Sequence, residues 1–434
     1  MANTQSDRPG IWARMTKTLL FWVVIAIFLG ALLGQFLPNW AIMPFATFND
    51  VFGKFLSFVV PLIIVGLVTP AIFELGRSGG KWLLITVGIA YSSTLVAGFG
   101  TWGISSLLYP SLLSGQKVPD LATPENAVAS IMDKSFTMPP VFGVTTALIL
   151  AFVLGLGMSA VRAEKMMHVF REFRELVMLV IMKAIVPFLP LHIFGIFLNM
   201  SKSGQFAHVL VAMAKIFVFA FVLTVVMLVL QYTLAGIVSK RNPFSALWGM
   251  REAYATALGT ASSAATIPIT IRCARNNRVS PEVADFVIPL CATIHLAGSA
   301  IKITAFALAL QHMMGIPTNA GAMVGFIFML GITMVAAPGV PGGAITAAQG
   351  VLQSILAFSD PMYAIMVAMY VAADSFGTAA NVTGDGAIAI LVNRMAKGTF
   401  GTDSPELAKE ADEISQGRSV KIRLGKRAHS DDGE

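Results

Sequence analysis

The hydrophobic pattern of this chain consists of long apolar runs separated by short polar or basic connections. A transmembrane helix needs about 20 consecutive apolar residues. Six runs of that length occupy the first half of the sequence, over 18–37, 44–74, 82–108, 139–163, 166–199 and 206–238. Pro38 ends the first run, and Pro187 and Pro190 interrupt the fifth. The stretch 109–138 is rich in Pro, Ser, Asp and Glu without helical periodicity, which predicts an exposed loop.

The pattern changes after Arg241, where two apolar segments are broken in the middle. Segment 246–271 contains the run TASSAATIP and has basic flanks, whereas segment 319–357 contains AAPGVPGG and has none. Unwound backbone at membrane depth is tolerated only where it is buried or lines a cavity. We therefore interpret both as re-entrant helical hairpins that enter from opposite sides, with Ser262 and Ser263 near the first tip. Such a pair indicates an inverted-repeat transporter site near the midplane; two ordinary kinked helices are the alternative.

Two further apolar segments, 283–310 and 361–398, carry polar residues inside them. The first is interrupted by ATIHLAGS. An ionised carboxylate inside a membrane costs at least about 2.5 kcal/mol, so it normally faces a partner, a cavity or an ion. Two carboxylates with an amide and a hydroxyl between them predict a place that holds a cationic group, whereas Asn and Thr alone often serve as interhelical contacts. At about 100° per residue, the polar side chains of 361–398 form one stripe: Asp374, Thr378, Asn381 and Asp385.

Composition supports a polytopic α-helical membrane protein. Of the 434 residues 56% are hydrophobic and only 12% are charged, whereas a soluble domain carries about 25% charged residues. A β-barrel is excluded because the apolar runs are continuous rather than alternating. The two cysteines, Cys273 and Cys291, provide neither a disulfide framework nor a metal cluster. The polar segments contain no nucleotide loop and no Ser/His/Asp or metal constellation, so an enzyme is not expected.

The basic residues indicate orientation in a membrane. The isoelectric point is near 9.4, but Lys and Arg gather in short connections and in the tail, an arrangement that does not indicate nucleic-acid binding. Positive-inside scoring places both termini in the cytoplasm, with residues 1–16 as a cytoplasmic N-terminus. Lys17 precedes an apolar run of spanning length without a small-residue cleavage site, so no cleavable signal is evident. The charged tail 399–434 lacks apolar periodicity, which predicts a disordered cytoplasmic segment.

The order of these segments closely resembles the dicarboxylate/amino acid:cation symporter family, which includes glutamate transporters and bacterial serine/threonine symporters. The resemblance covers about residues 17–398. Its most specific part is NVTGD at 381–385, which matches the family's final-helix motif residue for residue. The runs SSAATIP at 262–268 and GVPG at 339–342 support it in the two predicted hairpin tips.

The resemblance implies an all-α elevator-type transporter of eight transmembrane helices and two re-entrant hairpins. It would be a homotrimer in lipid of the inner (plasma) membrane. Helices 1–2 (17–74) and helices 4–5 (139–199) would form a fixed scaffold, and 109–138 an extracellular loop. The transport domain would comprise helix 3 (82–108) and residues 206–398, which contain helix 6, hairpin 1 (246–271), helix 7 (283–310), hairpin 2 (319–357) and helix 8 (361–398).

The resemblance also implies a substrate site. The α-ammonium of an amino acid would meet Asp374, since a carboxylate is the natural partner of an ammonium. Its α-carboxylate would meet the first hairpin tip near Ser263 and the amide of Asn381, because half-helix N-termini suit an anion. The substrate-binding residues implied are Ser262, Ser263, Thr266, Val340, Gly342, Asp374, Gly377, Thr378 and Asn381.

Sodium is the coupling ion that the resemblance implies, with no organic cofactor. One site would use Asp385, and a second would use backbone carbonyls only. The family's third site relies on an aspartate where this chain has Ala297, so that site has lost its anionic ligand. The ligands implied are Asp385 with oxygens near Cys291, His295 and Asn381; carbonyls near Thr293, Met334, Val335 and Ala337; and, as further candidates, Tyr91, Ser93 and Thr94.

Departures at the substrate pocket predict a neutral substrate. Acidic-substrate members have an arginine where this chain has Gly377, and many have another where it has Ala261. No fixed cation is then expected for a second carboxylate, whose burial unpaired would cost several kcal/mol. The leading interpretation is a Na+-coupled symporter of serine, threonine or alanine. Alternatives are proton coupling or pH gating of an amino acid or carboxylate transporter through His295, which could equally be a neutral, structurally satisfied imidazole, and a channel or non-transporting sensor.

Overall fold

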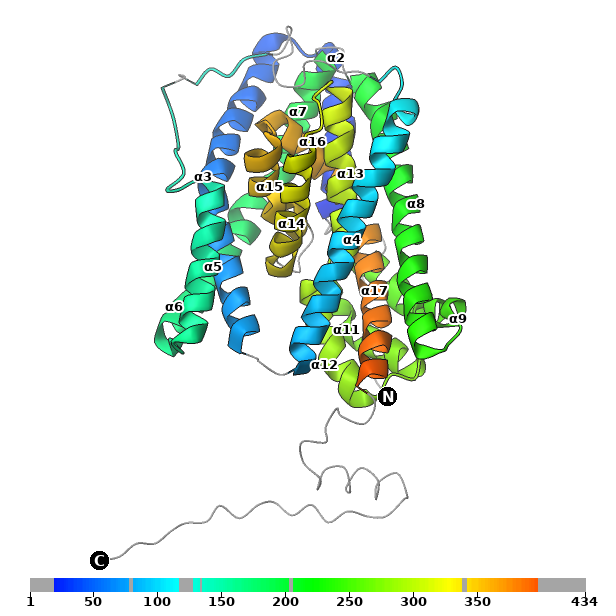
Figure 1. Ribbon diagram of the computed structural model, residues 1–434. Helices are drawn as coiled ribbons and strands as arrows, with labels where there is room; N and C mark the ends of the chain where they lie inside the picture. The colour runs from blue at the N-terminus through cyan, green and yellow to red at the C-terminus, as the bar shows by residue number, and fades with distance from the viewer. Residues whose placement is uncertain are drawn as a thin grey trace, which may run out of the picture.

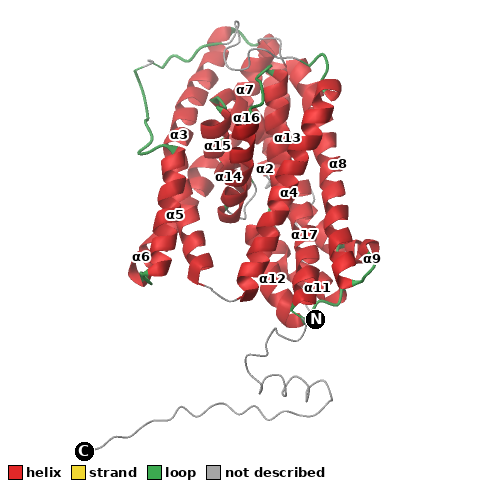
Figure 2. Ribbon diagram, in the orientation of Figure 1, coloured by secondary structure: helices red, strands yellow, loops and turns green. Residues whose placement is uncertain are grey.

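The computed structural model describes residues 19–77, 81–116, 128–132, 135–202, 206–337 and 342–396. Regular structure in these ranges is helical (Figure 2). The helices are α2 (Leu19–Phe36), α3 (Asn39–Arg77), α4 (Lys81–Leu112), α5 (Val144–Ala160), α6 (Glu164–Val180), η1 (Ile181–Ile185), α7 (Leu189–Lys202), α8 (Phe206–Ser239), α9 (Pro243–Gly249), α10 (Arg251–Thr260), α11 (Ser263–Asn276), α12 (Pro281–Ile294), α13 (Ala297–Met313), α14 (Ala320–Ala336), α15 (Gly343–Leu356), α16 (Asp360–Ala372) and α17 (Asp374–Met395).

The long helices stand side by side in an elongated bundle (Figure 1). In the described residues four helices are long and apolar enough to cross a membrane, or six if each of two bent pairs counts as one span. Many apolar side chains on their outer faces are exposed, such as Phe28, Val153 and Val218. This composition is that of a multi-pass membrane protein, because an apolar exterior is stable only in lipid.

Two groups of helices share the bundle. Helix α3 packs against α5, α6 and α7, and α2 packs along α7. Helix α17 lies among α8, α10, α11, α12 and α13, and α4 packs against α13 and α14 (Figure 1). Helices α14, α15 and α16 contact members of both groups, and the expected division into a scaffold and a moving transport domain stays a prediction.

Helix breaks appear at the interrupted segments of the sequence. Helices α10 and α11 pack together across a two-residue turn at Ala261–Ser262, and α14 packs against α15. The chain leaves the helix between α12 and α13 at His295–Leu296. Helices α6 and α7 are bent by 45° across η1 and the residues that follow, where Pro187 lacks an N–H for helical bonding.

The expectation of one continuous helix over 361–398 is wrong. Helices α16 and α17 are bent by 62° at Ala373, whose backbone has φ −97° and ψ 1°. Proline and glycine are absent from the residues next to this bend, so no local signal announces it. Asp374 therefore lies in the first turn of α17, where the positive end of the helix dipole favours a carboxylate.

Candidate substrate and cation site

The turn between α10 and α11 directs a helix N-terminus inward. Ala261 adopts a left-handed conformation with φ 49°, which ends α10. Ser262 then begins α11, and its Oγ accepts a hydrogen bond from Ala265 N at 3.3 Å. The buried Ser263 follows, and the first turn of a helix offers backbone N–H groups that can bind an anion.

A small cavity lies where the helix breaks meet. Its volume is about 30 Å3, whereas one water centre needs at least about 10–15 Å3. An amino acid can therefore enter only when the surrounding helices separate. Three of the substrate residues predicted on α17 line this cavity, and so does Ser263. The lining residues are Ala261, Ser263, Ala292, Thr293, Leu296, Ser299, Ala337, Ala344, Tyr370, Asp374, Thr378 and Asn381.

Asp374 has partners on both carboxylate oxygens. Gly342 N donates to Oδ2 at 2.8 Å, so the start of α15 is tied to the start of α17. Lys302 Nζ lies 3.5 Å from Oδ1, and both side chains are buried. The same ammonium donates to Ala373 O at 3.2 Å and lies 3.9 Å from the centre of the Tyr370 ring. A cation of the chain thus occupies one side of the carboxylate that was expected to meet the substrate.

Gly377 leaves the space that Lys302 fills. The three atoms nearest to a Cβ built at Gly377 all belong to Lys302, and the Cβ would overlap Cε and Nζ. The expectation that no fixed cation is left for a second substrate carboxylate stays a prediction, but it did not include Lys302, whose charge Asp374 balances. That expectation compared aligned positions only, whereas the ammonium of Lys302 reaches Gly377 from the neighbouring helix α13.

A second network positions Asn381. Gly298 N donates to Asn381 Oδ1 at 2.8 Å, and Asn381 Nδ2 donates to Ser299 Oγ at 3.3 Å. Tyr370 Oη donates to the same Ser299 Oγ at 2.9 Å. These bonds fasten the start of α13 to α16 and α17. Ser299 and Tyr370 were absent from the expected site, although both line the cavity.

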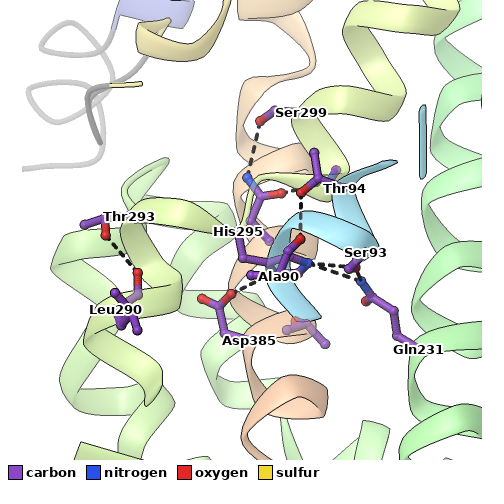
Figure 3. Close-up of polar contacts among 12 residues, drawn as sticks. Ala90, Ser93, Thr94, Gln231, Leu290, Thr293, His295, Ser299 and Asp385 are labelled. Carbon is purple, nitrogen blue, oxygen red and sulfur yellow. Dashed lines mark hydrogen bonds and ion pairs between the residues drawn. The ribbon is translucent and has the colours of Figure 1, made fainter. Parts of the chain in front are cut away.

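His295 links Asp385 to α4 and α8 in a buried chain of polar groups (Figure 3). Its Nδ1 lies 2.9 Å from Asp385 Oδ1, and its Nε2 lies 3.1 Å from Ser93 Oγ. Gln231 Nε2 donates to Ser93 Oγ at 2.8 Å. A hydroxyl both donates and accepts, so Ser93 can face either the neutral imidazole or the imidazolium. Asp385 Oδ2 is buried and has no hydrogen-bond partner among the described residues, which leaves an oxygen for a cation.

Only some of the remaining predicted cation ligands lie at the His295 network or at the cavity. Ser93 joins the His295 network, but Tyr91 Oη donates to Phe328 O at 3.2 Å and Thr94 Oγ1 to Ala90 O at 3.1 Å. Thr293 and Ala337 line the cavity. Met334 is buried and Val335 is partly buried in the apolar core. Cys291 O accepts from His295 N at 2.8 Å.

The other predicted substrate residues lie around the cavity rather than in it. Thr266 is buried, and its hydroxyl donates to Ser262 O at 2.8 Å. Gly342 touches Asp374 through its N–H. Val340 lies outside the described residues. Within those residues, groups of three or more His, Cys, Asp and Glu side chains that could hold a metal are absent, so a bound cation would depend on Asp385 and backbone oxygens.

Comparison with known proteins identifies the family. Residues 19–395 match the model of the sodium:dicarboxylate symporter family. The chain belongs to this family. It is 30% identical over 345 residues to the serine/threonine transporter SstT of Acinetobacter baumannii strain AYE, an alignment that covers 74% of this chain and 82% of the relative. The SstT proteins of strains AB307-0294 and AB0057 match with the same identity and coverage.

Membership in this family makes the chain a cation-coupled symporter and not an enzyme. The geometry agrees with such a protein. Asp374 and Asp385 lie about three turns apart on α17, one at the cavity and the other beside His295. Substrate and cation sites at these two residues would provide a direct route for coupling, since both could favour the same arrangement of the helix breaks.

Proposed function

We propose that this protein is a Na+-coupled symporter of small neutral amino acids of the serine, threonine or alanine type. It would work as a homotrimer in the inner (plasma) membrane, with both termini in the cytoplasm. Eight spans and two re-entrant hairpins, as expected from the sequence, would supply a scaffold and an elevator-like transport domain. The observation that carries the proposal is the cavity in which Ser263, Asp374, Thr378 and Asn381 meet.

The cavity lining supports a small substrate. Much of the wall is alanine, from Ala261, Ala292, Ala337 and Ala344. The start of α11 and the Asn381 amide would receive an α-carboxylate, while the Thr378 hydroxyl suits a polar group. The only charged lining side chain among the described residues is Asp374, and Lys302 balances its charge. A second substrate carboxylate would find no unbalanced cation there.

Asp385 supports sodium coupling. Its Oδ2 is a buried acceptor that has no partner in the part of the chain that the structure describes, and hard cations prefer carboxylate and carbonyl oxygens. Ordering of this region by sodium would favour the closed arrangement that holds the substrate. The names of the Acinetobacter relatives, serine/threonine transporters, agree with the substrate class.

A proton is the second candidate for the coupling ion, because Asp385 Oδ1 already faces the imidazole of His295 at 2.9 Å. An imidazolium would supply the positive charge that sodium supplies in the first case. Histidine is the side chain whose charge changes between pH 5 and 8 without special surroundings.

Counterflow in proteoliposomes tests the proposal. Purified protein would be loaded with serine, and exchange measured against a panel of amino acids, with Na+ or with an impermeant cation, at two pH values. We expect exchange of serine, threonine and alanine that requires Na+. Exchange that ignores Na+ and follows pH would replace sodium by a proton, and exchange of none of the three would refute the substrate class.

A further inference from the structure

Lys302 is a buried charged residue that the proposed transport cycle does not use. It lies in the middle of α13 with 2% of its surface exposed. Lys302 is not among the residues that line the cavity, whereas its partner Asp374 is. In the arrangement seen here, the ammonium would therefore act on a substrate through Asp374.

The surroundings of Nζ are those of a charged ammonium. The carboxylate of Asp374, the carbonyl of Ala373 and the face of the Tyr370 ring all attract positive charge or accept hydrogen bonds. An ammonium has three N–H donors and three such groups around it. The absence of a side chain at Gly377 allows this position, since a Cβ there would overlap Nζ.

A carboxylate with this partner has little need of a second cation. The family resemblance implies that the substrate's α-ammonium meets Asp374. Yet Asp374 already accepts from Gly342 N on Oδ2 and faces Lys302 at Oδ1. A buried unpaired carboxylate would bind an ammonium strongly, whereas a carboxylate whose charge is already neutralised would bind it weakly. The anion-binding side of the cavity, at Ser263 and Asn381, is unaffected by this pairing.

We propose that Lys302 is a specificity-determining residue that supplies, from within the chain, the cation for Asp374, so that the site also binds small carboxylates without an α-ammonium group. The ligand class is that of the 2-hydroxy acids whose carbon skeletons match the amino acids, such as glycerate beside serine and lactate beside alanine. This inference rests on the proposed function for the position of the substrate carboxylate.

The test compares ligands that differ only in the group on C2. Dissociation constants of serine and glycerate, and of alanine and lactate, would be measured on purified protein at saturating Na+. For the wild type we expect the ratio of dissociation constants, hydroxy acid divided by amino acid, to be below about 10. In Lys302→Met, the ligand ammonium becomes the only cation for Asp374, and loss of one partner of a buried charge pair costs roughly 30-fold or more. The ratio should therefore rise at least about tenfold.

The matched control is Lys215→Met, the same substitution at a lysine on α8 that donates to Leu112 O at 3.0 Å; its ratios should stay at the wild-type value. If Lys302→Met does not yield folded protein, the double variant Lys302→Met/Asp374→Asn removes both charges and decides instead. Its ratios should lie within about tenfold of the wild-type ratios if Lys302 already satisfies Asp374.

Three results would overturn the inference. The first is a wild-type ratio of dissociation constants above about 10, and the second is a rise of this ratio by less than about tenfold in Lys302→Met. The third is a wild-type ratio more than about tenfold that of the double variant. Failure of the proposed function looks different. In that case wild-type protein binds neither serine nor alanine, with Na+ or at any pH tested. Binding of serine with rejection of glycerate overturns only the role assigned to Lys302.

Discussion

His295 Nδ1 lies 2.9 Å from Asp385 Oδ1, and the imidazole is the only basic group recorded in contact with that buried carboxylate in the described structure. A proton on the imidazole and a sodium ion near Oδ2 would both neutralise the same acid. The two cations therefore compete, and this competition gives the proposed coupling a measurable pH dependence.

Acidification should weaken sodium binding. Because a proton on His295 would compete with Na+ for Asp385, the Na+ concentration for half-maximal serine binding should be higher at about pH 5.5 than at about pH 8. Simple competition allows up to about tenfold per pH unit. The measurement is a Na+ titration of serine affinity at both pH values. His295→Asn, which cannot carry the proton, should remove the pH dependence; an unchanged pH dependence in this variant would assign it to another group.

Asp385→Asn should weaken the link between sodium and substrate. The substitution keeps the shape of the side chain but removes the charge next to the free oxygen. We expect the Na+ requirement to increase by at least about tenfold, while serine affinity at saturating Na+ changes less. Binding of serine and of Na+ would be titrated separately, because the coupling between them must be reciprocal. Equal losses at every Na+ concentration would show that Asp385 supports the fold and does not bind the ion.

Asp374→Asn should destabilise the protein by leaving the ammonium of Lys302 buried without a carboxylate. Removal of one partner of a buried pair costs about 3–5 kcal/mol, whereas replacement of both is often neutral. Lys302→Met/Asp374→Asn should therefore recover much of the loss. Thermal unfolding in detergent, without substrate, provides the comparison. A double variant no more stable than Asp374→Asn would mean that the pair contributes nothing to the fold.

The effect of Gly377→Ala on stability should depend on the residue at position 302. It should be destabilising beside Lys302 and stabilising beside an alanine at that position. In the wild type the new methyl group overlaps Lys302, and overpacking costs about 1–3 kcal/mol. In a Lys302→Ala background the space is free, and alanine is up to about 1 kcal/mol better than glycine inside a helix. The same unfolding assay applies to all four proteins. Equal effects in both backgrounds would place the cause elsewhere than at Lys302.

Acidic amino acids should compete poorly with serine. The described cavity lining contains no basic side chain, and the nearby ammonium of Lys302 is balanced by Asp374. A second substrate carboxylate buried without a partner would lose several kcal/mol, which is over about 100-fold in affinity. Competition of aspartate and glutamate against labelled serine measures this. Competition equal to that of unlabelled serine would contradict the neutral-substrate assignment.

Much of the site was predictable from local sequence. The periodicity of α17 places Asp374, Thr378 and Asn381 at one cavity, and the serine-rich run correctly indicates a turn before Ser263. These features depend on helical spacing and on turn chemistry, which a single chain carries in its own order. The family was also recognisable from the NVTGD run.

The parts that were missed depend on contacts between distant segments. The bend at Ala373 lacks a proline or glycine, and Lys302 reaches its carbonyl from 71 residues away. A lysine inside the apolar run 283–310 was itself a signal, since an ionisable residue at membrane depth is a functional candidate by default. The partner of that lysine, however, only emerges when α13 and α17 are placed side by side.

The pairing of Asp374 with Lys302 and of Asp385 with His295 determines how the membrane voltage would act on movement of the site. Moving one elementary charge through 100 mV requires about 2.3 kcal/mol. Each acid carries its counter-charge on a neighbouring helical segment of the same chain. With the imidazole protonated, the unloaded site has almost no net charge from these four groups and could cross the electric field without electrical work. Because Na+ would replace that proton, the loaded site would be close to neutral as well, and the membrane potential would do little work on either crossing.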